Sequence, residues 1–159
     1  MRAQSMLLLA RDSEETIRMP DFDPAAFTQG LMADIRANGE VTTGPMAGRP
    51  LLILTTTGAK SGRSREAVLT YTKDGDRLCI AGSKSGAPTN PNWYHNLIAN
   101  PIVKVETGRE AFEARATVQE GSEHDRLWDN HVAARPEFAE YPKKSGRVIP
   151  MITLERLGS

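Results

Sequence analysis

An alternation of apolar and polar side chains over residues 103–118 restricts the possible folds of this chain most strongly. Val103 and Val105 alternate with charged residues, and after a turn at residues 107–109 the apolar positions recur at Phe112, Ala114, Ala116 and Val118. Successive side chains of a β-strand point to opposite faces of a sheet. The pattern therefore predicts an antiparallel hairpin with one face buried in a core and the other in water.

The remaining segments add strands and short helices to this hairpin. Apolar and β-branched runs predict strands at residues 51–57, 66–73, 77–82 and 148–157, with a tight turn at residues 74–75. Apolar residues at a spacing of four predict a helix over residues 24–38, and shorter helices are expected after residues 91, 122 and 136. Because strands do not alternate regularly with long helices, we expect an α+β, mainly β fold. A small barrel of about six mostly antiparallel strands with flanking helices fits this pattern.

The length of 159 residues suits one domain, which we expect at residues 21–159 behind a flexible lead-in at residues 1–20. The apolar run at residues 6–10 is far shorter than the roughly 20 residues that span a bilayer, so at most loose membrane contact is expected there. The 20 basic and 20 acidic residues balance. The chain therefore has no surplus of cations for a general nucleic-acid surface.

Cys79 is the only cysteine, and it lies in an apolar run. Because one cysteine cannot form an internal disulfide, we expect a buried thiol and a reducing, cytoplasmic environment. The histidines at positions 95, 124 and 131 show no metal-ligand spacing. No metal site is expected from them.

The segment from Thr55 to Arg65 gives the strongest indication of a binding site. Consecutive threonines lead into a turn that contains two glycines, Lys60, Arg63 and Arg65, and no acidic residue before Glu66. Glycines let backbone N–H groups approach an anion, and arginine binds phosphate through two parallel hydrogen bonds. The turn suits a phosphate-bearing ligand, and a solvated basic hairpin tip is the alternative.

A second loop, residues 81–88, also leaves a strand with small residues, hydroxyls and a lysine. It leads into residues 90–96, which combine amides with Trp93 and Tyr94. Small residues let a flat ring lie against the backbone, an indole can cover the ring, and amides can bind its polar edge. Trp93 as a core residue and Asn96 as a helix-end residue are the alternatives. Together, the loops favour a site for a phosphorylated, flavin-like cofactor and hence a small reductase.

Three runs in this order resemble the deazaflavin-dependent nitroreductase family, whose cofactor is coenzyme F420: TTTGAKSGRSR, AGSKSGAP and NPNWYHNLIANP. The similarity covers about residues 48–157. The resemblance implies a split β-barrel, which agrees with the strand pattern, and it makes residues 21–159 a cofactor-binding domain.

The resemblance also implies roles for individual residues. The cofactor's phosphate and tail are expected to meet Lys60, Ser61, Gly62 and Arg65. The deazaflavin ring is expected to lie against the backbone of Glu66, Ala67, Val68, Ala81, Gly82, Ser83 and Lys84. The ring and side chain are expected to be covered by Asn92, Trp93, Tyr94 and Asn96. Val68 stands where the family often has proline, and Ser85 stands where glycine is usual.

The substrate is expected on the exposed face of the ring, beside Phe138 and Tyr141. Tyrosine is frequent in the family where this chain has Phe138, so a hydroxyl that could orient or protonate a substrate is lost. Tyr141, Ser83 or solvent is expected to supply the proton, and a plain packing role is the alternative for Tyr141.

The resemblance implies hydride transfer from reduced F420 to electron-poor small molecules. The expected acceptors are enones or conjugated lactones, quinones and nitroaromatics. Two alternatives remain open, an FMN-dependent oxidoreductase on the same barrel and a deazaflavin carrier without catalysis, because a fold alone does not define a function. The sequence is compatible with a monomer or a small homo-oligomer.

Overall fold

The computed structural model describes residues 23–158, so the lead-in expected at residues 1–20 lies outside the described residues. The elements follow in the order α2 (Pro24–Asn38), β1 (Leu51–Thr57), β2 (Ser64–Thr70), β3 (Thr72–Asp74), β4 (Arg77–Ala81), η1 (Lys84–Gly86), α3 (Asn92–Ala99), β5 (Ile102–Thr107), β6 (Glu110–Gln119), α4 (Gly121–Ala134), η2 (Pro136–Ala139), α5 (Glu140–Ser145) and β7 (Met151–Arg156). The helix predicted at residues 24–38 is confirmed. Among residues 23–158, no helix has both the length and the apolar character that a membrane crossing requires.

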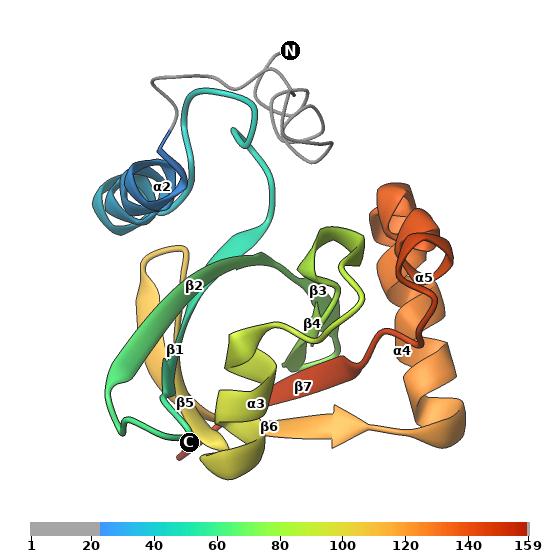
Figure 1. Ribbon diagram of the computed structural model, residues 1–159. Helices are drawn as coiled ribbons and strands as arrows, with labels where there is room; N and C mark the ends of the chain where they lie inside the picture. Colours follow the sequence, from blue (N-terminus) through green and yellow to red (C-terminus); the bar gives the residue numbers. More distant parts are fainter. Residues whose placement is uncertain (1–22, 159) are drawn as a thin grey trace.

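The strands of the described residues form one sheet in the order β2-β1-β5-β6-β7-β4-β3, and every neighbouring pair is antiparallel. β2 and β3 lie at opposite edges of this sheet, although only Tyr71 separates them in the chain. The sheet must therefore curl until its edges approach one another, as Figure 1 shows. This curled sheet with flanking helices agrees with the small barrel that the strand pattern predicts and is the split β-barrel that the family resemblance implies.

The strand predicted at residues 66–73 divides at Tyr71, which adds a strand to the expected set. The backbone N–H of Tyr71 donates to the carbonyl oxygen of Pro50 at 3.1 Å, whereas the next residue, Thr72, pairs with Cys79. The chain thus leaves one sheet edge and joins the other within a single residue. Apolar periodicity does not reveal this break, because it reports the face of a strand and not its partner.

The predicted hairpin, β5 with β6, supplies much of the barrel interior. Each apolar position of the alternation belongs to one hydrophobic cluster or packs against it: Val103, Val105, Phe112, Ala114, Ala116 and Val118. Trp93 and Leu97 of α3 enter the same cluster, so α3 is anchored directly on the barrel core. The expected burial of one hairpin face is confirmed.

Two smaller clusters hold the other helices against the sheet. Met32 and Ile35 of α2 pack with residues of β1, and Leu127 of α4 packs with residues of β4 and β7. Cys79 belongs to the second of these clusters and is fully buried. Desolvation raises the pKa of its thiol to about 11, so the thiol stays protonated and unreactive at neutral pH.

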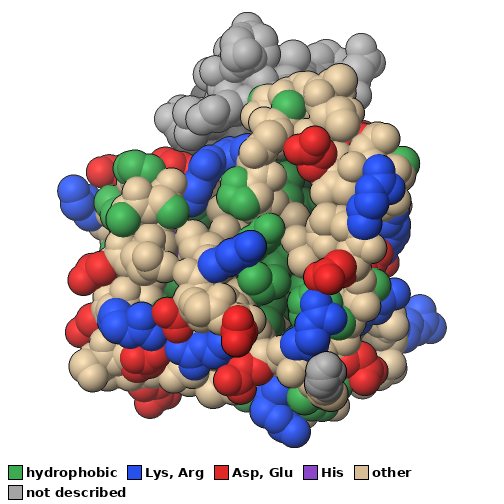
Figure 2. All heavy atoms as spheres, turned by 180° about the vertical axis from the view of Figure 1, so that it is seen from behind, with side chains coloured by type: hydrophobic (Ala, Val, Ile, Leu, Met, Phe, Trp, Pro, Cys, Tyr) green, Lys and Arg blue, Asp and Glu red, His purple; other side chains and the backbone are tan. Residues whose placement is uncertain are grey.

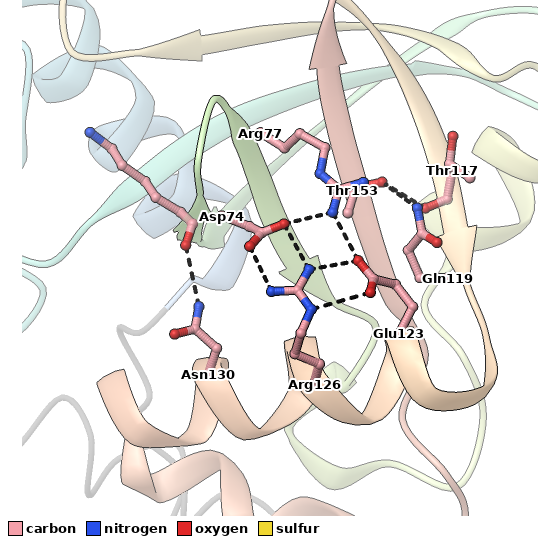
Figure 3. A network of polar contacts seen from close by, with 9 residues as sticks. Asp74, Arg77, Thr117, Gln119, Glu123, Arg126, Asn130 and Thr153 are labelled. Carbon is pink, nitrogen blue, oxygen red and sulfur yellow. Dashed lines mark hydrogen bonds and ion pairs between the residues drawn. The ribbon is translucent and has the colours of Figure 1, made fainter.

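A polar network joins α4 to the tip of the β3–β4 hairpin (Figure 3). Arg126 donates to both carboxylate oxygens of Asp74, at 2.9 and 3.0 Å, and also binds Glu123 at 2.6 Å. Arg77 donates to the same two acids, at 2.6 and 3.0 Å. The two guanidiniums hold the pKa of Asp74 well below its usual range, so the network persists at mildly acidic pH.

His131 of α4 is fully buried. Its Nδ1 lies 2.9 Å from Oγ1 of Thr72, its Nε2 has no partner among residues 23–158, and its ring meets Phe138 edge-on at 4.6 Å. Burial lowers the pKa of His131 to about 4, with Glu137 opposing and Arg135 adding to the effect. The imidazole is therefore neutral in the folded protein near pH 7.

We expect the free energy of unfolding to fall between pH 6.5 and pH 4. In that window His131 is protonated in the unfolded chain but neutral in the folded chain. This difference lowers the free energy of unfolding by up to about 3 kcal/mol. Urea denaturation at several pH values measures this loss. Above about pH 5, where the carboxylates with lowered pKa values such as Asp74 still contribute little, a His131→Gln variant should lose most of the dependence, whereas His95→Gln, at an exposed position, should keep it. Equal pH profiles for wild type and His131→Gln would contradict the assignment.

Candidate active site

A cavity of about 790 Å³ lies between the turn after β1, the start of β2 and helix α3. It is lined by Gly58, Ala59, Lys60, Ser61, Arg65, Glu66, Ala67, Asn92, Trp93, His95 and Asn96. Cofactor and small-molecule sites typically enclose roughly 300–1,000 Å³, so the cavity is large enough for one. The basic turn and the Trp93 segment, which the sequence places in one site, therefore face the same space.

The turn after β1 is closed by its own hydrogen bonds. The Gly58 N–H donates to the Arg63 carbonyl at 2.7 Å, the Gly62 N–H donates to the Gly58 carbonyl at 3.0 Å, and the Arg63 N–H donates to Oγ of Ser61 at 3.1 Å. A Cβ at Gly58 would lie 2.5 Å from Oγ of Ser61, and Gly62 has a φ of +72°. A side chain at Gly58 would therefore displace Ser61, and one at Gly62 would strain the backbone of this tight turn.

Asn96 of α3 fastens this turn to the helix. Its Oδ1 accepts the backbone N–H of Ala59 at 3.0 Å, and its Nδ2 donates to Oγ1 of Thr56 at 3.1 Å. Asn96 and Thr56 are both buried, at 8% and 1% exposure. The sequence predicts Asn96 as a cofactor contact, and the structure shows that its amide also holds the two walls of the cavity together.

The charges that face the cavity favour an anion. Lys60 and Arg65 are exposed, and neither has a carboxylate within ion-pair distance in the described part of the chain. Glu66 also lines the cavity, but its carboxylate is bound by Arg36 of α2 at 2.7 Å. The negative charge of Glu66 is thereby compensated, whereas Lys60 and Arg65 have no carboxylate partner among residues 23–158.

Arg36 is a residue of the site region that the sequence does not reveal. It donates two further hydrogen bonds to Glu106 of β5, both at 2.8 Å, and so connects α2 to two strands. These carboxylate bonds raise the pKa of Arg36 above its usual value. Its partners lie far away in the sequence, so no local spacing pattern indicates the cluster.

Trp93 serves the core and the cavity at once. Its side chain is only 9% exposed, it belongs to the barrel cluster, and it also lines the cavity. The neighbouring Tyr94 packs against the barrel cluster, while His95 lines the cavity and meets the Tyr94 ring edge-on at 5.4 Å. His95 is thus a lining residue that is absent from the predicted set, and Tyr94 is a predicted residue outside the lining.

The second predicted loop does not line this cavity. Ala81, Gly82 and Ser83 are buried and Lys84 is exposed, but none of the four is among the lining residues. Val68 packs against the α2 cluster, and the predicted contact of its backbone with a cofactor stays a prediction. Ser85 has a φ of +54°, a conformation that suits the glycine usual in the family better than serine.

The proposed substrate residues also lie outside the lining. Phe138 is 8% exposed and packs between His131 and Tyr141, with ring centroids 4.6 and 5.0 Å away. Burial raises the pKa of Tyr141, and the nearby Glu137 adds to this effect, so its phenol keeps its proton at neutral pH. Tyr141 can therefore act as a hydrogen-bond donor. It is not among the residues that line the cavity.

A second hollow of about 640 Å³ lies at the other end of β1, near Leu51. Its lining includes Tyr71, Phe112 and Arg156 but none of the residues predicted for the site. Acidic and basic side chains are interspersed over the face seen in Figure 2, where a hollow exposes hydrophobic side chains. The lining of the second hollow itself mixes both signs, with Glu40, Asp76 and Glu110 beside Arg49, Lys73, Arg109 and Arg156.

The comparisons with known proteins agree with this geometry. A family model described as F420H(2)-dependent quinone reductase matches residues 31–156. An F420H(2)-dependent quinone reductase of Mycobacterium tuberculosis is 40% identical over 111 residues, which are 67% of this chain and 74% of the relative. The solved structure of an F420-H2 dependent reductase (FDR-A) is 39% identical with a TM-score of 0.63, covering 67% of this chain and 95% of that one. A structure described as a domain-swapped dimer is 34% identical with a TM-score of 0.65, covering 84% and 100%.

The fold and these matches define a split-barrel reductase that uses coenzyme F420. The chain belongs to the F420H(2)-dependent quinone reductase family. The resemblance seen in the three sequence runs is thereby confirmed, as are the enzyme class and the cofactor that it implies.

Proposed function

We propose that this chain reduces quinones, and beyond them other electron-poor acceptors such as enones, conjugated lactones and nitroaromatics, with F420 held in the cavity between the basic turn and α3. The observation that carries the proposal is the pairing of two cations, Lys60 and Arg65, with an indole wall, Trp93, around one space. F420 supplies the hydride when it is bound. The family supports quinones most directly.

The residues present fit such a cofactor. Lys60 and Arg65 have no protein counter-ion among residues 23–158, and they can neutralise a phosphate and a negatively charged tail. The pairing of Glu66 with Arg36 removes the repulsion that a free carboxylate would cause. Trp93 presents an apolar surface against which a tricyclic ring can pack.

The protein's own part in the reaction is to orient the reactants, exclude water and supply a proton. We propose that the turn and α3 fix the cofactor, since correct placement supplies much of an enzyme's rate. Ser83 and Tyr141 are the proposed proton donors, and the raised pKa of Tyr141 keeps its proton available. Phe138 and Tyr141 are the proposed substrate residues. A small homo-oligomer is also proposed, because one relative's structure is described as a domain-swapped dimer.

Quenching of Trp93 fluorescence tests the binding step. Trp128 is the other tryptophan, so a Trp128→Phe variant leaves Trp93 as the single reporter. We expect F420 to quench this variant strongly and FMN to quench it weakly. The reciprocal Trp93→Phe variant, with a melting curve to verify folding, should lose most of the quenching.

Consumption of reduced F420 with a panel of acceptors tests the reaction. We expect turnover with quinones above background, and a smaller and variable rate with enones and nitroaromatics. Quenching by F420 without turnover of any acceptor would favour a carrier of the cofactor. Quenching by FMN alone would favour the FMN-dependent alternative.

A further inference from the structure

Arg147, between α5 and β7, directs its hydrogen bonds at the loop that connects β4 to α3. Its guanidinium donates to the carbonyl oxygens of Gly82, Ser83, Ala87 and Thr89, at 3.0, 3.3, 3.1 and 2.9 Å, and to Oδ1 of Asn90. Two of these carbonyls follow β4 directly, and only Pro91 separates Thr89 and Asn90 from α3. One side chain therefore holds both ends of the loop.

The partners of Arg147 carry no net charge. No carboxylate of residues 23–158 lies within ion-pair distance of its guanidinium, and partial burial lowers its pKa. A partly desolvated cation is costly unless polar groups compensate it. Here the carbonyl oxygens of the loop provide that compensation. The loop therefore stabilises the charge of Arg147, and Arg147 in turn holds the loop in place.

The loop that Arg147 holds contains an uncommon backbone conformation. Lys84, Ser85 and Gly86 have φ values of +47°, +54° and +86°, which form a left-handed turn. The left-handed region is sterically unfavourable for residues with a Cβ, so such a conformation persists only where the surrounding structure enforces it. The Arg147 bonds to Ser83 and Ala87 flank the turn on both sides and can supply that constraint.

The end of the loop determines where α3 begins. Helix α3 has no side-chain cap at its N-terminus, and its first residues, Asn92 and Trp93, line the cavity. Thr89 and Asn90, which Arg147 binds, lie three and two residues before Asn92. A shift of this entry point would move the α3 wall of the cavity.

We infer that Arg147 is a positioning residue of the cofactor site, which fixes the loop at residues 82–91 and thereby the α3 wall that carries Trp93. This inference rests on the proposed function, in which the cavity binds F420. In that proposal α3 contacts the deazaflavin ring of F420 through Trp93. Loss of Arg147 should therefore weaken binding of the ring. Loss of Lys60 should instead weaken binding of the phosphate.

The test compares Arg147→Lys and Arg147→Ala with Arg77→Lys. Arg77 is a half-buried arginine of the network around Asp74, so it controls for a general loss of stability. Dissociation constants are measured for F420 and for the deazaflavin nucleoside that lacks the phosphate and tail. We expect Arg147→Lys to raise both dissociation constants by about ten-fold, because α3 is then no longer held in place and must be ordered when the ligand binds. We expect Arg77→Lys to leave both constants unchanged.

Added guanidinium ion provides a second readout. It should restore part of the binding lost in Arg147→Ala, because it can occupy the space between the same carbonyl oxygens, and it should not help Lys60→Ala. If Arg147→Lys lowers the melting temperature as Arg77→Lys does and leaves both constants unchanged, Arg147 is merely structural and the inference fails.

Hydrogen exchange of the ligand-free protein separates this inference from the proposed function. In Arg147→Lys we expect faster exchange at residues 82–96 than in wild type, with unchanged exchange at residues 58–63. Failure of wild type to bind either deazaflavin would overturn the proposed function. Unchanged exchange at residues 82–96 would overturn the positioning role, whatever the ligand.

Discussion

Replacement of Lys60 or Arg65 with alanine is expected to weaken F420 binding by about 10- to 150-fold for each residue, the effect of losing a hydrogen bond to a charged group. Both side chains line the cavity, and neither has a carboxylate partner in the described residues that would compete with a phosphate. Fluorescence titration with F420 measures the change.

The same turn provides a matched control. Arg63 is exposed and lies between the two cations in sequence, but it does not line the cavity. Arg63→Ala should therefore bind F420 almost as wild type does. The deazaflavin nucleoside without phosphate should bind equally well to all three variants. A loss for Arg63→Ala as large as that for Lys60→Ala would show that only the general positive charge of the turn matters.

Replacement of Asn96 with alanine is expected to lower the free energy of unfolding by about 2–3 kcal/mol and to weaken F420 binding as well. The change leaves the buried hydroxyl of Thr56 without its partner and releases the Ala59 N–H. The turn is then no longer fastened to α3, so binding must also order the turn. Urea denaturation and F420 titration measure the two effects.

Asn100 offers the control for this variant. It lies one turn further along, at the end of α3, and its Nδ2 donates to the Thr57 carbonyl at a long 3.4 Å. Asn100→Ala should therefore change stability by less than about 1 kcal/mol, because a long hydrogen bond contributes little. If Asn96→Ala and Asn100→Ala prove equally mild, the fastening role of Asn96 is wrong.

Much of the fold follows from local patterns in the sequence. The alternation around Val103 and Phe112 predicts the central hairpin because a strand shows one face to the core. Apolar residues at a spacing of four predict α2 because such a spacing gives a helix one apolar face, and Met32 and Ile35 are buried on it. The division of a predicted strand at Tyr71 escapes such patterns, because it depends on which sheet edge each half joins.

The candidate site divides in the same way. The glycines, cations and Trp93 can be read from the sequence because each residue type carries its own chemistry, and the cavity brings them together. The contacts that hold these residues in place cannot be predicted from the sequence, because they join segments that are distant in the chain. They are the pairs Arg36 with Glu66, Asn96 with Ala59, and Arg147 with the loop after β4. No periodicity or local motif specifies pairs of this kind.

The most direct test of the central claim is a crystal structure of the protein with F420 bound. We expect the phosphate within hydrogen-bond distance of Lys60 and Arg65, and the deazaflavin ring packed beside Trp93 in the cavity of about 790 Å³. A cofactor bound instead in the hollow lined by Tyr71 and Phe112, with the turn at residues 58–63 facing solvent, would contradict the account.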